Sequence, residues 1–411
     1  GVAHSSAALA EGMRCRGHQC LVVAPEFPGQ PEDETGVLRI PSLQHFNGTD
    51  FSFKLPSGTR ISDALHRFQP DLIHCHHPFL LGDAGLRMAH QWNLPLVFTH
   101  HTRYENYVHY VFEESDWLER LAIELATEFA NLCDLVIAPS GSIARLIQER
   151  GVTVPVEVIP TGIDRERFAS GDGERVRRET GCSPETFLLG HVGRLAEEKN
   201  LPYLMEAVSR FLKDQPEAAF LLVGEGDCQE LLREISEKYG VADRVYWRGK
   251  LTGRDLVDHY RAMDLFAFSS RSETQGMVLA EAMASGVPVI ALDASGVRDI
   301  VRDGENGWLL DADTRPDAFA RALAKCRDWI AEGKTERETA LEETARAFSA
   351  ERSLDRTESV YRALIDAASS SERDLDAWAR FSHRLEAEWD LALGRVRAVG
   401  AAFRKSKESG S

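Results

Sequence analysis

The chain has 411 residues, which exceeds what one hydrophobic core usually supports and favours two domains. Hydrophobic residues make up 43% of it and charged residues 27%, as in soluble globular proteins. No run approaches the roughly 18 apolar residues of a membrane span, which excludes an integral membrane protein. A formal net charge of -17 disfavours a broad nucleic-acid-binding surface and the docking of a whole face onto anionic lipid.

The seven cysteines are scattered, odd in number and without C-x-x-C spacing. This pattern favours a reducing compartment over a disulfide framework or a zinc site, so we expect a cytoplasmic protein. The chain opens with a helix-like stretch at 2–16, which Gly17 ends and an apolar strand at 20–25 follows. In a parallel sheet such a helix follows a strand. Because no strand and no initiator Met precede it, we expect the native start to be missing.

Short apolar runs bounded by Pro, Gly or Asp recur along the chain with helical segments between them. Fully buried parallel strands have this pattern, so the runs predict an α/β protein of two doubly wound units. In chain order they are residues 20–25, 71–76, 95–100, 134–140, 156–162, 187–193, 219–226, 244–249, 264–270 and 287–292.

A polar, charged stretch at 164–186 separates the fifth run from the sixth and predicts a linker between the two units. Helical segments follow at about 337–349 and 352–368, and a Ser-rich break then precedes a last helix at 372–405. The predicted domains are 1–168 and 169–350, followed by a helix at 351–371 that returns to the N-terminal domain and by an additional amphipathic helix and tail at 372–411.

The helix at 372–405 has one apolar stripe, with residues three or four apart, and several cations near its end. Two interpretations stay open. The stripe packs on this protein or on a second copy in a homodimer, or the helix lies in a membrane interface with its cations toward the headgroups.

Arg194 and Lys199 lie on the loop that follows the strand at 187–193 and precedes an amphipathic helix. Ligands of open α/β sheets bind at the carboxyl ends of strands, where helix N-termini point positive dipoles at anions. Two cations five residues apart at such a turn, next to Gly193, predict a diphosphate site. The alternative is a pair of solvated surface charges.

Two acids follow the strand at 264–270. Glu273 precedes Gly276, which allows close backbone approach and opens a helix whose free N–H groups suit a phosphate oxygen. Glu281 falls one turn into this apolar helix, where an unpaired carboxylate is costly. A ribose diol offers two donors to one carboxylate, so we expect Glu281 to hold a ribose. The alternative is a structural glutamate bonded to neighbouring backbone.

These motifs carry a resemblance to a known family. "GRLAEEKNL" (193–201), "ETQGMVLAEAMASGVPVIA" (273–291) and "GVRDIVRDGENGWLL" (296–310) resemble the retaining nucleotide-sugar glycosyltransferases of family four. "PDLIHCHHPF" (70–79) and "VIPTGIDRERF" (158–168) also have counterparts there. The resemblance covers roughly residues 1–368 and implies the GT-B fold, in which two Rossmann-like domains face a cleft.

The resemblance implies a role for each matching residue. Arg194 and Lys199 would neutralise the donor diphosphate, Glu273 would bind a hydroxyl of the donor sugar, and Glu281 the ribose. His101 matches the active-site histidine that reaches the donor sugar near the reacting centre. Gly1 matches the second glycine of a loop that touches the phosphates and the acceptor. The remaining donor-binding positions would be Gly193, Gly224, Gly226, Gly249, Lys250, Leu251, Gly276, Met277 and Val278.

Five histidines, at 74, 76, 77, 100 and 101, raise the question of a metal site. Nothing in the sequence adds the Cys or carboxylate spacing that would complete one. The family resemblance needs no metal either, because Arg194, Lys199 and the helix amides supply positive charge. We therefore expect no metal and no cofactor.

The segment "HTRYENYVHY" (101–110) is similar to the corresponding part of bacterial diacylglycerol glucosyltransferases, which use UDP-glucose. The expected function is therefore retaining, metal-independent transfer of glucose from UDP-glucose to a lipid hydroxyl, with peripheral membrane contact. The acidic helix that follows this segment argues against a lipid acceptor. Two alternatives stay open: a soluble sugar or saccharide acceptor, and a catalytically silent sugar-nucleotide-binding protein. A dinucleotide-dependent oxidoreductase is disfavoured because no G-x-G-x-x-G opens a helix.

Overall fold

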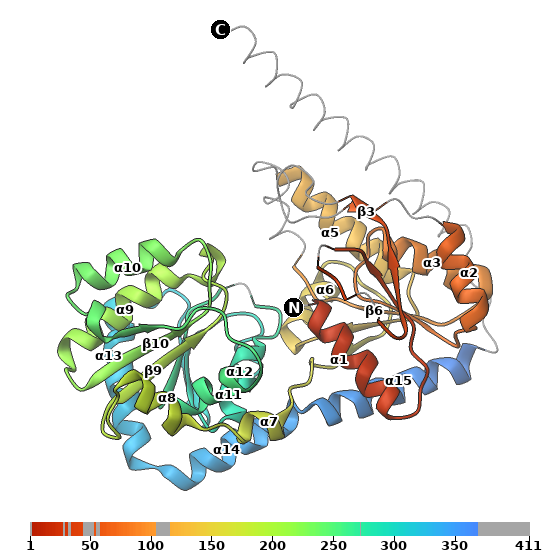
Figure 1. Ribbon diagram of the computed structural model, residues 1–411. Coiled ribbons are helices and arrows are strands. Elements are labelled where there is room, and N and C mark those ends of the chain that lie inside the picture. Colours follow the sequence, from red (N-terminus) through yellow and green to blue (C-terminus); the bar gives the residue numbers. More distant parts are fainter. Residues whose placement is uncertain are drawn as a thin grey trace, which may run out of the picture.

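Two α/β domains lie side by side in the computed structural model, and the last two helices run along one side of both (Figure 1). The structure describes residues 2–27, 29–31, 34–43, 53–54, 58–103, 116–271 and 273–368. Gly1, most of the segment 101–110 and the predicted helix at 372–405 lie outside these residues.

The N-terminal domain alternates strands and helices. Its larger sheet is parallel with the order β5-β6-β7-β8, while β1 and β2 form a separate parallel pair and β3 and β4 an antiparallel one. The elements are α1 (Val2–Cys15), β1 (Val22–Pro25), β2 (Val37–Ile40), β3 (Ser42–Leu43), β4 (Phe53–Lys54), α2 (Gly58–Phe68), β5 (Ile73–Cys75), α3 (Leu81–Trp92), β6 (Leu96–Thr99), α5 (Asp116–Asn131), β7 (Leu135–Ala138), α6 (Gly141–Glu149) and β8 (Val156–Val158).

The C-terminal domain has one six-stranded parallel sheet with the order β11-β10-β9-β12-β13-β14. Its elements are α7 (Arg165–Ala169), α8 (Gly173–Thr180), β9 (Phe187–Val192), η2 (Glu197–Lys199), α9 (Leu201–Asp214), β10 (Ala218–Val223), α10 (Gln229–Lys238), η3 (Ala242–Arg244), β11 (Val245–Trp247), α11 (Gly253–Ala262), β12 (Leu265–Phe268), α12 (Met277–Ala284), β13 (Val289–Leu292), β14 (Gly307–Leu310) and α13 (Pro316–Glu332). The strand order reverses between β9 and β12, and a crevice forms at the carboxyl ends of such a pair.

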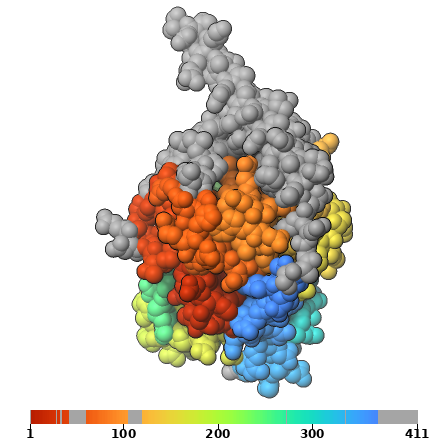
Figure 2. All heavy atoms as spheres, turned by 90° about the vertical axis from the view of Figure 1, so that its right-hand side faces the viewer, coloured from red at the N-terminus to blue at the C-terminus, as the bar shows by residue number. Residues whose placement is uncertain are grey.

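The last two described helices, α14 (Lys334–Ala347) and α15 (Ala350–Ala368), pass from the C-terminal domain to the N-terminal domain. Tyr361 and its apolar neighbours on α15 pack against the buried residues Val97 and Leu135 of the N-terminal sheet. Arg16, just after α1, pairs with Asp355 at 2.6 Å and with Glu358 at 2.9 Å. The surfaces of α1 and α15 accordingly lie side by side, red next to blue (Figure 2).

The stretch at 164–186, which the sequence predicts as a linker between the two units, contains the short helices α7 and α8. Phe168 and Val176 are buried in the core of the C-terminal domain. Asp164 and Asp172 cap the two helices by accepting hydrogen bonds from backbone N–H groups. These two helices were not predicted, because one buried apolar residue in each short helix is too weak a signal against many charges.

All ten apolar runs contain a strand, and the two predicted doubly wound units are present. β2, β3, β4 and β14 were not predicted, because β3 and β4 have only two residues each and β2 and β14 carry short patterns of mixed burial. In the part of the chain that the structure describes, no helix combines the length and the apolar character needed to cross a bilayer.

Gly224 follows β10 and touches the loop after β9. Its φ is 145°, and a Cβ there would lie 1.8 Å from the carbonyl oxygen of Gly193. Gly224→Ala should therefore force the backbone apart and cost about 2–3 kcal/mol, or roughly 5–10 °C in Tm for a domain of this size. Gly181→Ala is the matched control, because Gly181 also has a positive φ, 72°, but has no atom within 4 Å of its Cβ position. Calorimetry that shows equal losses of Tm in the two variants would contradict this account.

Candidate active site

One cleft of about 3040 Å³ is lined by residues of both domains. From the C-terminal domain it takes the loops that follow β9 and β12 and the first turns of α12, as expected for the point where the strand order reverses. From the N-terminal domain it takes α1 and the ends of β5 and β6. The predicted site residues that line it are His101, Gly193, Lys199, Lys250, Leu251, Glu273, Gly276, Met277, Val278 and Glu281.

Lys199 and Glu273 form an ion pair in this cleft, with 2.6 Å between Nζ and Oε1. Their side chains are only 23% and 15% exposed, so water screens the pair incompletely. The Ser269 hydroxyl lies 3.0 Å from the carbonyl oxygens of both Lys199 and Asn200 and donates to them. It thereby joins the loop after β9 to the end of β12 and fixes the distance between the two charges.

Arg194 takes a different direction. Its guanidinium pairs with Glu198, one helical turn further along the same loop, and its side chain is 55% exposed. It is absent from the described residues that line the cleft. The structure therefore does not bring the two predicted cations together, and the diphosphate role of Arg194 stays a prediction that requires its side chain to leave Glu198.

The N-terminus of α12 opens onto the cleft. Gly276 precedes the helix with a φ of 76°, a conformation that glycine adopts readily. The first turn contains no acidic side chain, and Met277 and Val278 line the cleft. Because the first N–H groups of a helix have no partner within it, this end of α12 suits an anionic ligand.

Glu281 lies one turn further along α12 and accepts a hydrogen bond from the Tyr260 hydroxyl at 2.8 Å. Burial raises the pKa of Glu281 above its usual range, and the bond from Tyr260 and the positive charge of Arg167 oppose that rise. Tyr260 is completely buried, and burial beside this carboxylate keeps its pKa well above normal, so its hydroxyl remains a donor. The predicted buried carboxylate thus has a side-chain partner that the sequence did not reveal.

Three of the glycines predicted as donor-binding positions do not line the cleft but lie where neighbouring loops touch. Gly224 donates its N–H to the carbonyl of Gly249 at 2.8 Å, and a Cβ on Gly226 would lie 2.4 Å from the carbonyl oxygen of Leu195. Gly224, Gly226 and Gly249 are absent from the described residues that line the cleft, whereas Lys250 and Leu251 are among them. These glycines therefore let the loops after β9, β10 and β11 pack against one another.

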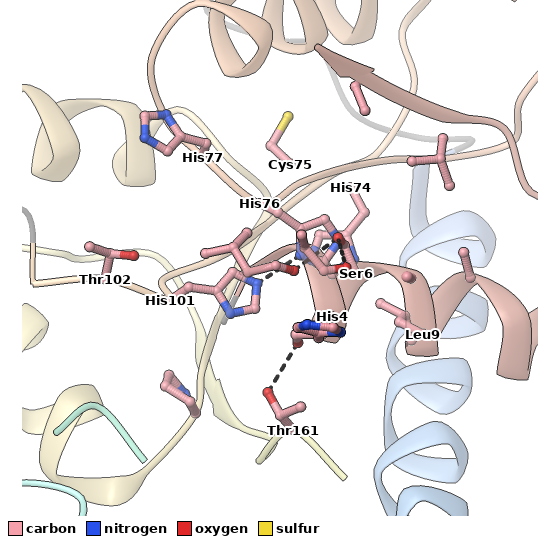
Figure 3. A pocket seen from close by; sticks show the side chains of 18 of the residues that line it. His4, Ser6, Leu9, His74, Cys75, His76, His77, His101, Thr102 and Thr161 are labelled. Carbon is pink, nitrogen blue, oxygen red and sulfur yellow. Dashed lines mark hydrogen bonds between the residues drawn. The ribbon is translucent and has the colours of Figure 1, made fainter. Parts of the chain in front are cut away.

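On the N-terminal side, the ends of β5 and β6 bring histidines together (Figure 3). His76 Nδ1 lies 2.8 Å from His101 Nε2, within hydrogen-bonding distance. His74 is held between the Tyr361 hydroxyl at 2.5 Å and the Thr99 hydroxyl at 2.7 Å. Burial lowers the pKa of His76 to about 4 and of His101 to about 3, so both rings are neutral at pH 7.

Comparison with known proteins identifies the family. The model of Glycosyltransferase Family 4 matches residues 1–167, and that of Glycosyl transferases group 1 matches residues 172–347. A GDP-mannose-dependent alpha-mannosyltransferase of Mycobacterium tuberculosis is 30% identical over 79% of this chain and 84% of its own length. The chain belongs to glycosyltransferase family 4.

Two further comparisons describe this family 4 glycosyltransferase more closely. The alpha-monoglucosyldiacylglycerol synthase of Streptococcus pneumoniae is 28% identical over 75% of this chain and 71% of its own length. The crystal structure of Anabaena HepE in complex with UDP matches 88% of this chain and 96% of its own with a TM-score of 0.70 at 22% identity. That likeness confirms the GT-B fold predicted from the sequence.

One residue of this glycosyltransferase, Gln275, was missed by sequence reasoning although it lies between Glu273 and Gly276. Its side-chain amide accepts from Thr161 N–H and donates to Thr161 C=O, both at 2.8 Å. Ser140 also donates to the Thr274 carbonyl at 2.7 Å. Because Ser140 and Thr161 belong to the N-terminal domain, the loop that carries Glu273 is held by both domains. Only its position within the motif pointed to Gln275.

Glu281→Gln should raise the stability of the C-terminal domain at neutral pH. A carboxyl whose pKa is raised in the folded state binds more protons there than in the unfolded chain, so stability falls as pH rises through its titration range. The amide removes this cost and still accepts from Tyr260. We expect Tm at pH 7.5 to rise by about 2–4 °C for about 1 kcal/mol, with the gain shrinking as the carboxyl becomes protonated in acid.

Glu206→Gln is the matched control. The hydrogen bond from Arg210 lowers the pKa of Glu206, the opposite direction, so its amide variant should show no gain in Tm. A lower Tm of Glu281→Gln at pH 7.5 would contradict the assigned cost.

Proposed function

We propose that the chain transfers glucose from UDP-glucose to a hydroxyl of a glycerolipid such as diacylglycerol, with retention of configuration and without a metal ion. The observation that carries the proposal is the convergence of Lys199, Glu273, Glu281 and the N-terminus of α12 on one cleft between the domains. A nucleotide diphosphate sugar offers each of them a partner. The ammonium and the helix N–H groups suit the diphosphate, and the two carboxylates suit hydroxyl pairs of the sugar and the ribose.

Binding of the nucleotide-sugar donor changes the partners of Lys199 and Glu273. Before it binds, Lys199 and Glu273 neutralise one another. When the donor enters, the ammonium turns to the diphosphate and the carboxylate accepts from the hydroxyls of the sugar. Positive charge for the departing diphosphate then comes from Lys199 and the α12 amides, which is why no divalent cation is included in the proposal.

Bond breaking leaves positive charge on the sugar while negative charge grows on the diphosphate, and fixed donors around the diphosphate stabilise that state over the ground state. The acceptor hydroxyl attacks from the face that the diphosphate leaves. The departing phosphate oxygen takes the proton of the acceptor, so retention requires no protein nucleophile.

Names of relatives support the lipid acceptor. Alpha-monoglucosyldiacylglycerol synthases of Streptococcus pneumoniae and Acholeplasma laidlawii both match 75% of this chain, at 28% and 26% identity. The match to the Mycobacterium tuberculosis mannosyltransferase and a 30% match to a D-inositol 3-phosphate glycosyltransferase favour a second candidate, a transferase with another donor or a soluble acceptor. Membrane contact through 372–405 and a homodimer stay predictions.

The direct test is transfer from radiolabelled UDP-glucose to diacylglycerol in mixed micelles. We expect a labelled lipid that an α-glucosidase cleaves, formed equally well with excess EDTA. GDP-mannose as donor and inositol phosphate as acceptor, assayed in parallel, test the second candidate. Label that reaches only soluble products, or a product resistant to the α-glucosidase, would overturn the proposal.

Lys199→Ala should lower the transfer rate by about 10- to 150-fold. A hydrogen bond to a charged group contributes about 1.5–3 kcal/mol, and each 1.36 kcal/mol is a factor of ten in rate. Lys213→Ala is the control, since Lys213 is exposed in the last turn of α9 and loses the same side chain away from the cleft. Initial rates within twofold of the parent for Lys199→Ala would remove this residue from the proposed site.

A further inference from the structure

The hydrogen bond between His76 and His101 joins two imidazoles that both line the cleft. His76 directly follows β5 and His101 follows β6, and the two rings are stacked with centroids 5.1 Å apart. Figure 3 shows this bond among the side chains that line the cleft. Neither a metal nor an acid–base role in the proposed reaction explains why a second histidine faces the first.

The number of ring protons limits the hydrogen bonds that this histidine pair can offer to a ligand. Two neutral imidazoles carry two N–H groups, and one of them lies in the shared bond. One N–H and one lone pair therefore remain, on His76 Nε2 and His101 Nδ1. Neither of these two nitrogens has a hydrogen bond to a described residue, and neither is among the buried nitrogens that lack a partner. Both are therefore open to the cleft. Whichever nitrogen holds the shared proton decides which end donates.

The surroundings hold His76 in place. The His74 ring lies 4.2 Å from the His76 ring, and the hydroxyls of Tyr361 and Thr99 engage both nitrogens of His74. Among the described residues, the titratable groups that act on His101 are His76, His77 and His100, and each lowers its pKa. No carboxylate is among them. The cluster is therefore built to stay uncharged.

We propose that His76 is a positioning residue that donates its Nδ1–H to His101 Nε2 and so leaves His101 with an N–H at Nδ1 toward the cleft. This inference rests on the proposed function, which places a sugar and its diphosphate in front of His101. The ring oxygen, the glycosidic oxygen and the phosphate oxygens of such a donor only accept hydrogen bonds, so an N–H there is useful and a lone pair is repelled. A neutral ring also adds no repulsion to the positive charge that develops on the sugar.

Three substitutions of His76 separate the effect of hydrogen-bond donation from the effect of side-chain size. In His76→Asn the amide N–H takes the place of Nδ1–H and can still donate. His76→Asp can only accept when ionised, so it reverses the tautomer of His101 and raises the pKa of that ring. His76→Ala removes the bond. His66→Asn is the control, since His66 is an exposed histidine on α2 that is absent from the lining of the cleft.

The expected outcome with UDP-glucose follows from these differences. His76→Ala should lower kcat about tenfold, with KM for UDP-glucose changed less than about twofold, and His76→Asn should recover most of that loss. His76→Asp should be at least as slow as His76→Ala. The acid limb of its pH–rate profile should move toward neutrality, because the carboxylate favours the charged ring. Equal rates in the Asn and Ala variants, or recovery by Asp alone, would overturn the proposal.

A second readout needs no turnover. Nitrogen-15 NMR of the histidine-labelled chain distinguishes the two neutral tautomers, and the His101 signals are assigned by their loss in His101→Gln. We expect protonated Nδ1 in the parent and in His76→Asn, and protonated Nε2 in His76→Asp. A parent with protonated Nε2 would refute the assigned direction. If the parent does not transfer glucose, the proposed function fails while this measurement still decides the role of His76. Thermal unfolding of each variant checks that it is folded.

Discussion

The ion pair between Lys199 and Glu273 is the interaction on which the organisation of the cleft depends. It can form because β9 and β12 are neighbouring strands at the point where the strand order reverses. The loops that follow these two strands therefore border the same crevice. Ser269 holds these loops together through the carbonyls of Lys199 and Asn200. Before a ligand binds, the ion pair also gives each of these two poorly exposed charges a partner. This avoids the cost of an unpaired charge in the cleft.

The buried carboxylate of Glu281 shows how the site trades stability for binding. Burial raises its pKa, and one bond from Tyr260 offsets only part of that cost. An apolar residue in its place would avoid that cost, but it would leave the buried Tyr260 hydroxyl without its partner. On the proposed function, the cost is retained because the free oxygen of the carboxylate is complementary to a ribose diol and needs no rearrangement to receive it.

Sequence predicted the parts of this structure that local pattern determines. The ten strands are apolar runs with clear boundaries, and the positions of Lys199, Glu273 and Gly276 follow from where those strands end. Partners that come from elsewhere in the fold were not predictable. Tyr260 reaches Glu281 from α11, and Gln275 finds Thr161 across the domain boundary. Arg194 pairs with Glu198, four residues further along the same loop, and the spacing of the two predicted cations did not reveal this acid as a partner.

The histidine pair differs in charge from the groups that the C-terminal domain brings to the cleft, and on the proposed function this difference suits a reaction that separates charge. The loops after β9 and β12 contribute Lys199, Glu273 and the N-terminus of α12, which would meet the diphosphate and the sugar. His76 and His101 are held neutral by burial. A cation at the position of His101 would oppose the positive charge that grows on the sugar, and an anion there would hold the sugar instead of releasing it to the acceptor. Neutral rings that share one proton avoid both, and they still offer a directed donor.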